Sequence, residues 1–262
     1  MFLKVLKYDL KFDYKNLIIF YILSLFFALT GRICSLFDNS GIMLIISKIN
    51  NGIVIAMFVN IVINNLLRVW ARFVLNFYKD ESYLTHTLPV EKNILYLSKI
   101  VSGIITMLSS TIVIILCLFI CYYSKENIEL LKSSIDFVAN MYESSVASFI
   151  TRVFFLVFAE LTFILITGYL GIIIGHKSNN GKMLKSCIYG FIFYMLSSLL
   201  VLLSVYVSGL FNSDIMNLFT STNIMMSVFK MLIFIVTIVY FILIIIEYLV
   251  GLKEINKGVN ID

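Results

Sequence analysis

The octapeptide GIIIGHKS, at residues 171–178, comes nearest in this 262-residue sequence to a motif for enzyme chemistry. A phosphate-binding loop places its second glycine directly before a lysine and a hydroxyl residue, so that backbone N–H groups surround a phosphate. Here His176 separates Gly175 from Lys177, and the peptide ends an apolar run instead of following a soluble strand. We therefore expect no phosphate site here, and we find no nucleophile paired with a base elsewhere. No catalytic residue is predicted.

Histidine and cysteine, the usual zinc ligands, are too scattered to predict a metal site. The sequence has two histidines, His86 and His176, and residues so far apart are more often surface groups than ligands. Cys117 and Cys121 share a helical face but have no histidine or carboxylate near them in the sequence. All four cysteines fall in or beside apolar runs, which favours small buried residues over a disulfide framework.

The composition identifies the class of protein. Hydrophobic residues make up 61% of the chain and charged residues 13%, too few to cover a water-soluble globule. The apolar runs are as long as helical spans need to be, about 20 residues, and they do not alternate in polarity as barrel strands do. The predicted fold class is an all-α integral membrane protein, with one transmembrane domain over residues 1–262.

Two amphipathic stretches accompany the apolar runs. In residues 1–16, lysines recur at helical spacing beside apolar residues, which is typical of an interfacial helix on an anionic leaflet. In residues 124–148, apolar residues fall at steps of three and four between charges, which predicts an amphipathic helix over the outer face of the membrane. The six predicted spans cover about 17–37, 53–72, 95–123, 149–175, 186–211 and 224–250.

Lysine and arginine in the short loops predict the orientation, because these residues prefer the cytoplasmic side. An N-terminus inside the cell places Lys48, Lys125 and Lys132 on the outer side, with Arg32, Lys99, Arg152 and Lys230 left uncounted because they lie near span ends. Both termini, the segment 78–93 and the loop 176–185 are then cytoplasmic. The thirteen basic residues assigned to the cytoplasm are Lys4, Lys7, Lys11, Lys15, Arg68, Arg72, Lys79, Lys92, Lys177, Lys182, Lys185, Lys253 and Lys257.

Three polar side chains lie near the middle of predicted spans. Asn60 and Asn64 are one helical turn apart in the second span, and Glu160 lies in the fourth. A carboxylate at that depth is costly unless it is paired, neutralised or facing water, so Glu160 should face protein or a cavity. Interhelical hydrogen bonding and a role in a conduit are both open interpretations.

Small residues recur in the fourth and fifth spans. Thr167, Gly171 and Gly175 occupy every fourth position, which lets two helices approach closely in lipid. We interpret these three residues as a packing face. Helix packing is also the favoured interpretation of the serines in the fifth span, which are Ser197, Ser198, Ser204 and Ser208.

The segment 78–93, YKDESYLTHTLPVEKN, separates the second and third spans and contains the single proline of the chain. Acidic residues could complement the positive end of a short helix, and the proline suits the first turn of the next helix. Apolar side chains with flanking charges, on a loop that should face water, indicate a docking surface. The predicted docking residues are Glu81, Tyr83, Leu84, Leu88 and Pro89; His176 and Lys177 are candidates for a secondary cytoplasmic contact.

The stretch ESYLTHTLPVEKNILYLSK, residues 81–99, resembles a motif of the permease subunits of type 2 ATP-binding-cassette exporters. In that family it reads E-G-Y-L-x-x-x-L-P-x-(S/T)-x-x-x-(I/L)-x-x-S-K and contains the coupling helix that docks into the ATPase. Ser82 replaces the usual glycine and Glu91 the usual small hydroxyl residue. The matching residues are Glu81, Tyr83, Leu84, Leu88, Pro89, Ser98 and Lys99. The predicted topology, with its N-terminal interfacial helix, resembles the family over nearly the whole chain.

This resemblance implies a half-transporter of the bacterial cytoplasmic membrane. Two copies of the permease would pair with two copies of a separate cytoplasmic ATPase, and ATP and Mg would bind to that ATPase instead of to this chain. Members of the family export amphipathic substrates such as peptides, drugs or lipids, and some confer self-immunity. The implied partners are the ATPase, a second permease, membrane lipid and the substrate, with no nucleic acid.

Two other functions are compatible with the sequence. One is an ion-coupled secondary transporter with Glu160 as its ion or proton site, although no internal repeat and no helix broken by glycine or proline is visible at mid-membrane. The other is a non-transporting immunity or scaffold protein that anchors a partner in the membrane. Retention of an ATPase subunit on purification would distinguish the exporter from both.

Overall fold

The computed structural model describes residues 1–37, 40–87, 89–142, 144–220 and 226–258. Throughout these residues the regular secondary structure is α-helical, and no strand is present in them. Six of the helices are long and apolar enough to cross a membrane. The prediction of an all-helical, multi-pass membrane protein is therefore confirmed.

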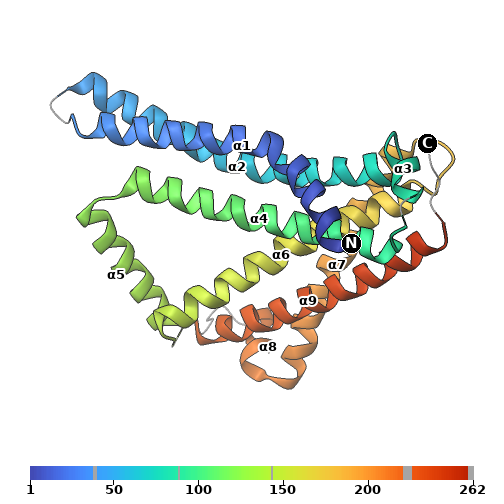
Figure 1. Ribbon diagram of the computed structural model, residues 1–262. Helices are drawn as coiled ribbons and strands as arrows, with labels where there is room; N and C mark the ends of the chain where they lie inside the picture. Colours follow the sequence, from blue (N-terminus) through green and yellow to red (C-terminus); the bar gives the residue numbers. More distant parts are fainter. Residues whose placement is uncertain (38–39, 88, 143, 221–225, 259–262) are drawn as a thin grey trace. The chain divides into compact units, whose positions relative to one another are not determined.

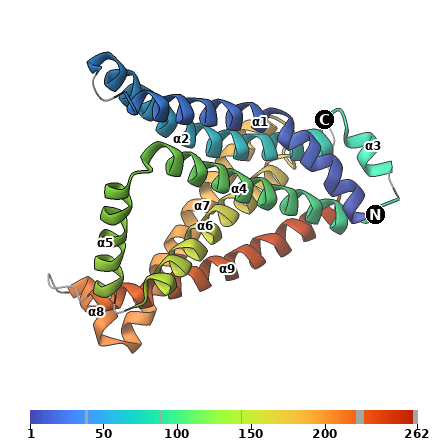
Figure 2. The ribbon, with the colours of Figure 1, turned by 60° about the vertical axis from the view of Figure 1, so that its left-hand side comes forward.

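The helices belong to two compact units, Met1–Ile128 and a second that begins at Glu129. Figures 1 and 2 show the helices in two orientations. Unit 1 contains α1 (Phe2–Ser35), α2 (Gly41–Phe77), α3 (Ser82–Thr87) and α4 (Lys92–Tyr122); α5 (Lys125–Met141) runs from the end of unit 1 into unit 2. Unit 2 also contains α6 (Val146–Gly175), α7 (Lys182–Phe211), α8 (Ser213–Thr220) and α9 (Met226–Asn256).

In unit 1, α1 packs along both α2 and α4. The buried positions of α1 recur every three or four residues, so they form one continuous face of the helix. Apolar clusters fill the interface: Leu17, Tyr21 and Ile61 form one, and Ala28 packs with Val54 and two cysteines of α4 in another. The buried residues of α1 are Leu6, Asp9, Asp13, Leu17, Tyr21, Ser24, Ala28 and Gly31.

Helix α1 runs from Phe2 to Ser35 without a break, whereas a separate interfacial helix was predicted over residues 1–16. Asp9 lies on the buried face because it meets basic side chains of α2 and α4 inside unit 1. The buried face of α1 that packs against α2 and α4 therefore extends into its first turns. An interfacial position on a lipid leaflet remains a prediction for this part of the helix.

Helix α2 begins at Gly41, about three turns before the predicted second span. The polar residues of this first part gave the impression of a loop, but they face α1. Asn50 Nδ2 donates to Thr30 Oγ1 at 3.2 Å. A Cβ atom on Gly31 would lie 2.8 Å from Asn51 Oδ1, so a larger residue there would require the Asn51 side chain to shift. Hydrogen bonding to small residues of α1 thus extends the helix.

In unit 2, α6 packs against α7 and α9. Helix α6 begins at Val146, three residues before the predicted span, where the Ser145 hydroxyl accepts a bond from the N–H of Ser148 at 3.4 Å. Helix α8 was not predicted. It begins after Asn212, whose side-chain oxygen accepts from the N–H of Asp214 at 2.9 Å. This local hydrogen bond satisfies one donor at the start of a short helix.

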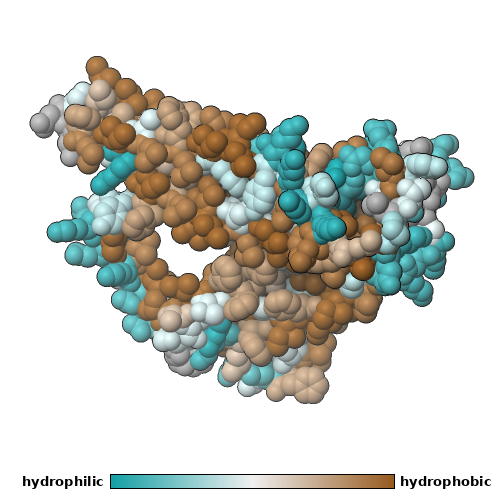
Figure 3. All heavy atoms as spheres, in the orientation of Figure 1, coloured by the Kyte–Doolittle hydropathy of each residue, from teal (hydrophilic) through white to brown (hydrophobic). Residues whose placement is uncertain are grey.

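The outer surfaces of the long helices are apolar. On α1, Ile18, Ile22 and Phe26 are each about half exposed, and Figure 3 shows hydrophobic atoms over the visible flank of the α1–α2 pair. Hydrophilic atoms gather near the N-terminus. This distribution suits helices whose outer faces contact lipid.

Candidate functional site

A cluster of charged side chains is buried between α1, α2 and α4. Lys99 Nζ bonds to the Asp9 carboxylate and to the side-chain oxygen of Asn76. Ser98 Oγ donates to Asp9 Oδ2 at 2.9 Å, and Arg72 Nε lies 3.6 Å from Asp9 Oδ1. The Asp9 and Lys99 side chains are 1% and 3% exposed, so both charges are removed from solvent. Neither charge would be tolerated there without the other.

The cluster continues into α3 through Glu81. Glu81 Oε2 accepts from Arg72 Nη1 at 2.7 Å and also from Asn76 Nδ2. His86 of α3 places Nε2 3.2 Å from the carbonyl oxygen of Phe77, and its ring meets the Phe77 ring edge-on at 5.8 Å. These contacts hold α3 against the C-terminal end of α2, which is predicted to lie on the cytoplasmic side. We call the set Asp9, Arg72, Asn76, Glu81, Ser98 and Lys99 the charge network.

The predicted docking residues differ in exposure and in the direction of their side chains. Tyr83 and Leu84 point away from the unit, with 74% and 68% of their surface exposed. Pro89 is also exposed, and Leu88 lies outside the described residues. Glu81 was predicted to belong to the same surface, but its carboxylate bonds inward. Ser82, which replaces a glycine of the family motif, is 1% exposed, so a small side chain suits this position.

Aromatic and acidic groups surround the charge network on α1 and α2. The Arg72 guanidinium lies over the Phe12 ring at 4.4 Å, which adds a cation–π contact. Asp13, one turn after Asp9, is fully buried, and neither of its carboxylate oxygens accepts a hydrogen bond within the described part of the chain. Tyr78, at the end of α2, is 2% exposed, and this burial raises the pKa of its phenol. The interior of unit 1 is therefore charged as well as apolar.

Near the middle of α2, the asparagine that makes interhelical hydrogen bonds is Asn65, whereas Asn60 and Asn64 were predicted. Asn64 Nδ2 bonds back to Asn60 on the same helix, and Asn60 is exposed. Asn65 is fully buried; its Nδ2 donates to Ser110 Oγ at 2.8 Å, and its oxygen accepts from Thr106 Oγ1 at 2.9 Å. It lies four residues after the buried Ile61, on the same face of α2, and the apolar run in the sequence does not show which face is buried.

Unit 2 buries a carboxylate that was also missed. Glu247 of α9 is 5% exposed and accepts from Thr167 Oγ1 at 2.6 Å and from Ser197 Oγ at 3.4 Å. The predicted carboxylate, Glu160, is only half-buried. Glu247 lies three residues before the end of the predicted span 224–250, so the argument from mid-span depth that selected Glu160 did not select it. It joins α6, α7 and α9 through hydroxyl groups of the neighbouring helices.

At Gly171 and Gly175 the backbone of α6 lies close to the backbone of α7. A Cβ atom on Gly171 would lie 2.6 Å from the Cα of Gly190, and one on Gly175 would overlap Ser186. Backbone atoms cannot move aside as a flexible side chain can. The absence of side chains on α6 therefore permits this contact.

The candidates for a secondary cytoplasmic contact are both engaged within unit 2. His176 is 1% exposed, with Nδ1 3.2 Å from Ser186 Oγ. Lys177 forms an ion pair with Glu254, and its side chain is 39% exposed. Partial burial lowers the pKa of Lys177, and the neighbouring positive charge of Lys257 lowers it further. Lys177, but not His176, offers part of its surface to a partner.

The described residues contain no metal-binding group, and the buried polar contacts of unit 1 join several helices. Throughout the described ranges no group of three histidine, cysteine or acidic residues is placed to hold a metal ion. The charge network instead connects α3 to three long helices through charged and polar contacts. In comparisons with known proteins, no family model, no curated protein and no solved structure matches this chain.

Proposed function

We propose that this chain is the membrane-spanning subunit of an ATP-driven exporter, with α3 as the element that a separate cytoplasmic ATPase contacts. The observation that carries the proposal is the two-sided character of α3. Tyr83 and Leu84 face outward, while Glu81 faces the charge network. Exposed aromatic and aliphatic anchors beside polar groups are typical of a docking surface.

The charge network supplies the path for a coupled motion. A displacement of α3 acts first on Glu81, which holds Arg72 and Asn76 of α2. Asn76 and Asp9 both bond to Lys99, so the displacement reaches α4 and α1. Asp9 and Lys99 are both buried, so breaking their contact would leave buried charges unpaired, which is costly, and α1 and α4 therefore move together. Pro89 would fix the direction in which α4 follows α3.

The remaining parts of the proposal follow from the family resemblance. Two copies of the chain pair with two ATPase subunits in the bacterial cytoplasmic membrane, with both termini on the cytoplasmic side. The ATPase binds ATP and Mg. The substrate is amphipathic, in the class of peptides, drugs or lipids, because the long helices offer chiefly apolar surfaces.

Replacing Leu84 by aspartate tests the docking role. Leu84 is 68% exposed, so the change should leave the fold of this chain intact while placing a charge in the contact. We expect the tagged variant, purified from its native membrane, to lose an ATP-binding-cassette ATPase that the wild type retains. Vanadate-trapped nucleotide in the purified complex should fall in parallel.

Leu184→Asp is the matched control, because Leu184 has the same exposed fraction and lies at the start of α7. It should retain the ATPase. If the wild type retains no ATPase, or if Leu84→Asp retains it as well as Leu184→Asp does, α3 is not the docking element.

Ion-coupled transport is a second candidate, and Glu247 is the residue that favours it. A carboxylate buried among helices and held by Thr167 and Ser197 is a typical proton or ion site. Vesicles that contain the purified chain would then conduct protons under an imposed K⁺ diffusion potential, reported by an internal pH-sensitive dye. Glu247→Gln should abolish that flux and Glu160→Gln should not. An absence of flux with the wild type would remove this candidate.

A further inference from the structure

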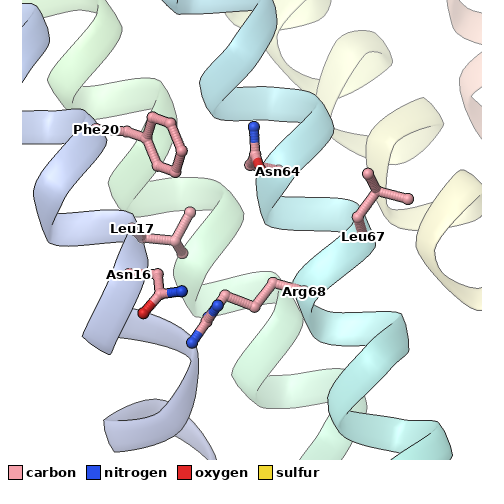
Figure 4. Close-up of a pocket in the computed structure, with 6 residues that line it drawn as sticks. All are labelled: Asn16, Leu17, Phe20, Asn64, Leu67 and Arg68. Carbon is pink, nitrogen blue, oxygen red and sulfur yellow. The ribbon is translucent and has the colours of Figure 1, made fainter.

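A pocket of about 270 Å³ opens between α1 and α2 of unit 1. Figure 4 shows the Arg68 side chain reaching from α2 toward α1, and the Asn16 amide pointing into the same space from α1. Apolar side chains form the rest of the wall. The lining residues are Asn16, Leu17, Phe20, Asn64, Leu67 and Arg68.

The Arg68 guanidinium has no acidic partner in contact. Within the described part of the chain it forms no ion pair at 4.0 Å or less, and the Asp13 carboxylate attracts it only from a greater distance. Its Nε and Nη2 atoms each lie 3.4 Å from the carbonyl oxygen of Phe12, and the group sits 5.0 Å from the Phe12 ring. These contacts position the guanidinium but do not neutralise it. Its planar fork of donors remains suited to a phosphate or carboxylate.

The pocket lies where both helices change from polar to apolar. In α1, the lysine-rich residues 1–16 end at the pocket and the apolar run 17–37 begins there. In α2, the apolar run that starts at residue 53 reaches Arg68. A run of about 20 apolar residues matches the hydrocarbon thickness of a bilayer, so this boundary corresponds to the headgroup level. Exposed Lys11 and Lys15 add positive potential beside it.

We propose that this pocket binds the headgroup phosphate of an anionic membrane phospholipid. The Arg68 guanidinium pairs with the phosphate, and the Asn16 amide, which has no hydrogen bond among the described residues, donates to it. Phe20 and the half-exposed Leu67 contact the first carbons of the acyl chains. A free phosphate ion would use only the polar half of the pocket, whereas a phospholipid uses both halves. This proposal does not depend on the exporter function.

The test uses the purified full-length chain in a neutral detergent. Phosphatidylglycerol, added at increasing concentration, should raise the melting temperature and remain bound at one molecule per chain in native mass spectrometry. Phosphatidylcholine and inorganic phosphate at matched concentrations should do neither. Arg68→Gln should weaken phosphatidylglycerol binding by about tenfold or more, because a charge-assisted bidentate contact is lost.

Arg32→Gln is the matched control, since Arg32 is a half-buried arginine of α1 remote from the pocket in sequence, and it should bind as the wild type does. Asn16→Leu tests the same site without changing a charge, and because Asn16 is exposed this variant should fold. It should also weaken binding. Equal binding of phosphatidylglycerol and phosphatidylcholine, an equal effect of inorganic phosphate, or unchanged binding in both Arg68→Gln and Asn16→Leu would overturn the proposal.

Discussion

The two units share an order of helices but differ in what they bury. Each has two long helices, a short one and a third long one: α1 to α4 in unit 1 and α6 to α9 in unit 2. In each, the first long helix packs against the other two. Such a correspondence was not visible as a sequence repeat. It lies in the order and packing of the helices instead of in residue identity.

The interior of unit 1 is organised by opposite charges. Asp9 and Lys99 come from helices far apart in the sequence and neutralise one another, with Arg72 beside them. In unit 2 the buried carboxylate, Glu247, is held by the hydroxyl groups of Thr167 and Ser197. One unit therefore compensates buried charge with charge, and the other with neutral hydrogen-bond donors.

The difference lies in how each unit holds its helices together. The charge network includes Glu81, so α3 is joined to the interior of unit 1 by directional contacts. In unit 2, the close approach at Gly171 and Gly175 sets the distance between α6 and α7 through backbone contact. Backbone contact fixes the distance between two helices, whereas the charge network joins α3 to α1, α2 and α4 through side chains.

Removing the Asp9 side chain is expected to cause the largest loss of folding stability. Asp9→Ala leaves Lys99 buried without its acidic partner, and the loss of one member of a buried pair typically costs about 3–5 kcal/mol. Unfolding of the purified protein in detergent with increasing SDS should show this loss. Adding Lys99→Met to Asp9→Ala should recover part of it, because the unpaired charge is then absent.

Asp80→Ala provides the control, since Asp80 is exposed and close to α3 in the sequence. It should leave the unfolding curve unchanged. Equal stability of Asp9→Ala and the wild type would show that the charges of unit 1 do not support one another, and the contrast between the two units would disappear.

A smaller loss of folding stability is expected for Gly175→Ala in unit 2. The added Cβ atom would overlap Ser186, including backbone atoms, and overpacking of this kind typically costs about 1–3 kcal/mol. Gly190→Ala is a close control on the facing helix, because a Cβ atom there meets nothing within 4 Å. The same unfolding assay should separate the two variants. Similar curves for both would mean that α6 and α7 are not held at a fixed backbone distance.

The sequence allowed the class and the six helices that are long and apolar enough to cross a membrane to be predicted, because long apolar runs depend only on local composition. The exposure of Tyr83 and Leu84 also agrees with a polar segment that separates two spans. What could not be predicted was the pairing of Asp9 with Lys99. The two residues are 90 positions apart, and a lysine-rich helix start gives no sign that one of its acids is buried.

Other misses have simpler causes. The start of α2 was placed too late because Asn50 and its polar neighbours suggest a loop until their partners on α1 are known. Asn60 and Asn64 were predicted because they lie near the middle of the span. Burial depends instead on which face of the helix a residue occupies, and the buried face of α2 contains Asn65. Glu247 was not predicted because it lies near the end of the predicted sixth span, where depth alone does not indicate burial. The position of a residue along a membrane span can be predicted from a single sequence. Its hydrogen-bond partner on another helix can be identified only when the packing of the helices is known.

The smallest expected effect, and the sharpest test of the link between α3 and unit 1, comes from Glu81→Gln. The Glu81 side chain is 44% exposed, so solvent screens its pair with Arg72 and the global stability should fall by less than about 1 kcal/mol. Locally the change removes the charge that holds Arg72 and Asn76. Amide hydrogen exchange in Ser82–Thr87 should therefore become faster, while exchange in the middle of α2 stays the same. Asp80→Asn should leave both regions unchanged. Unaltered exchange of α3 in Glu81→Gln would mean that other contacts, such as that of His86 with the Phe77 carbonyl, hold this helix, and Glu81 would then not be the link between α3 and the charge network.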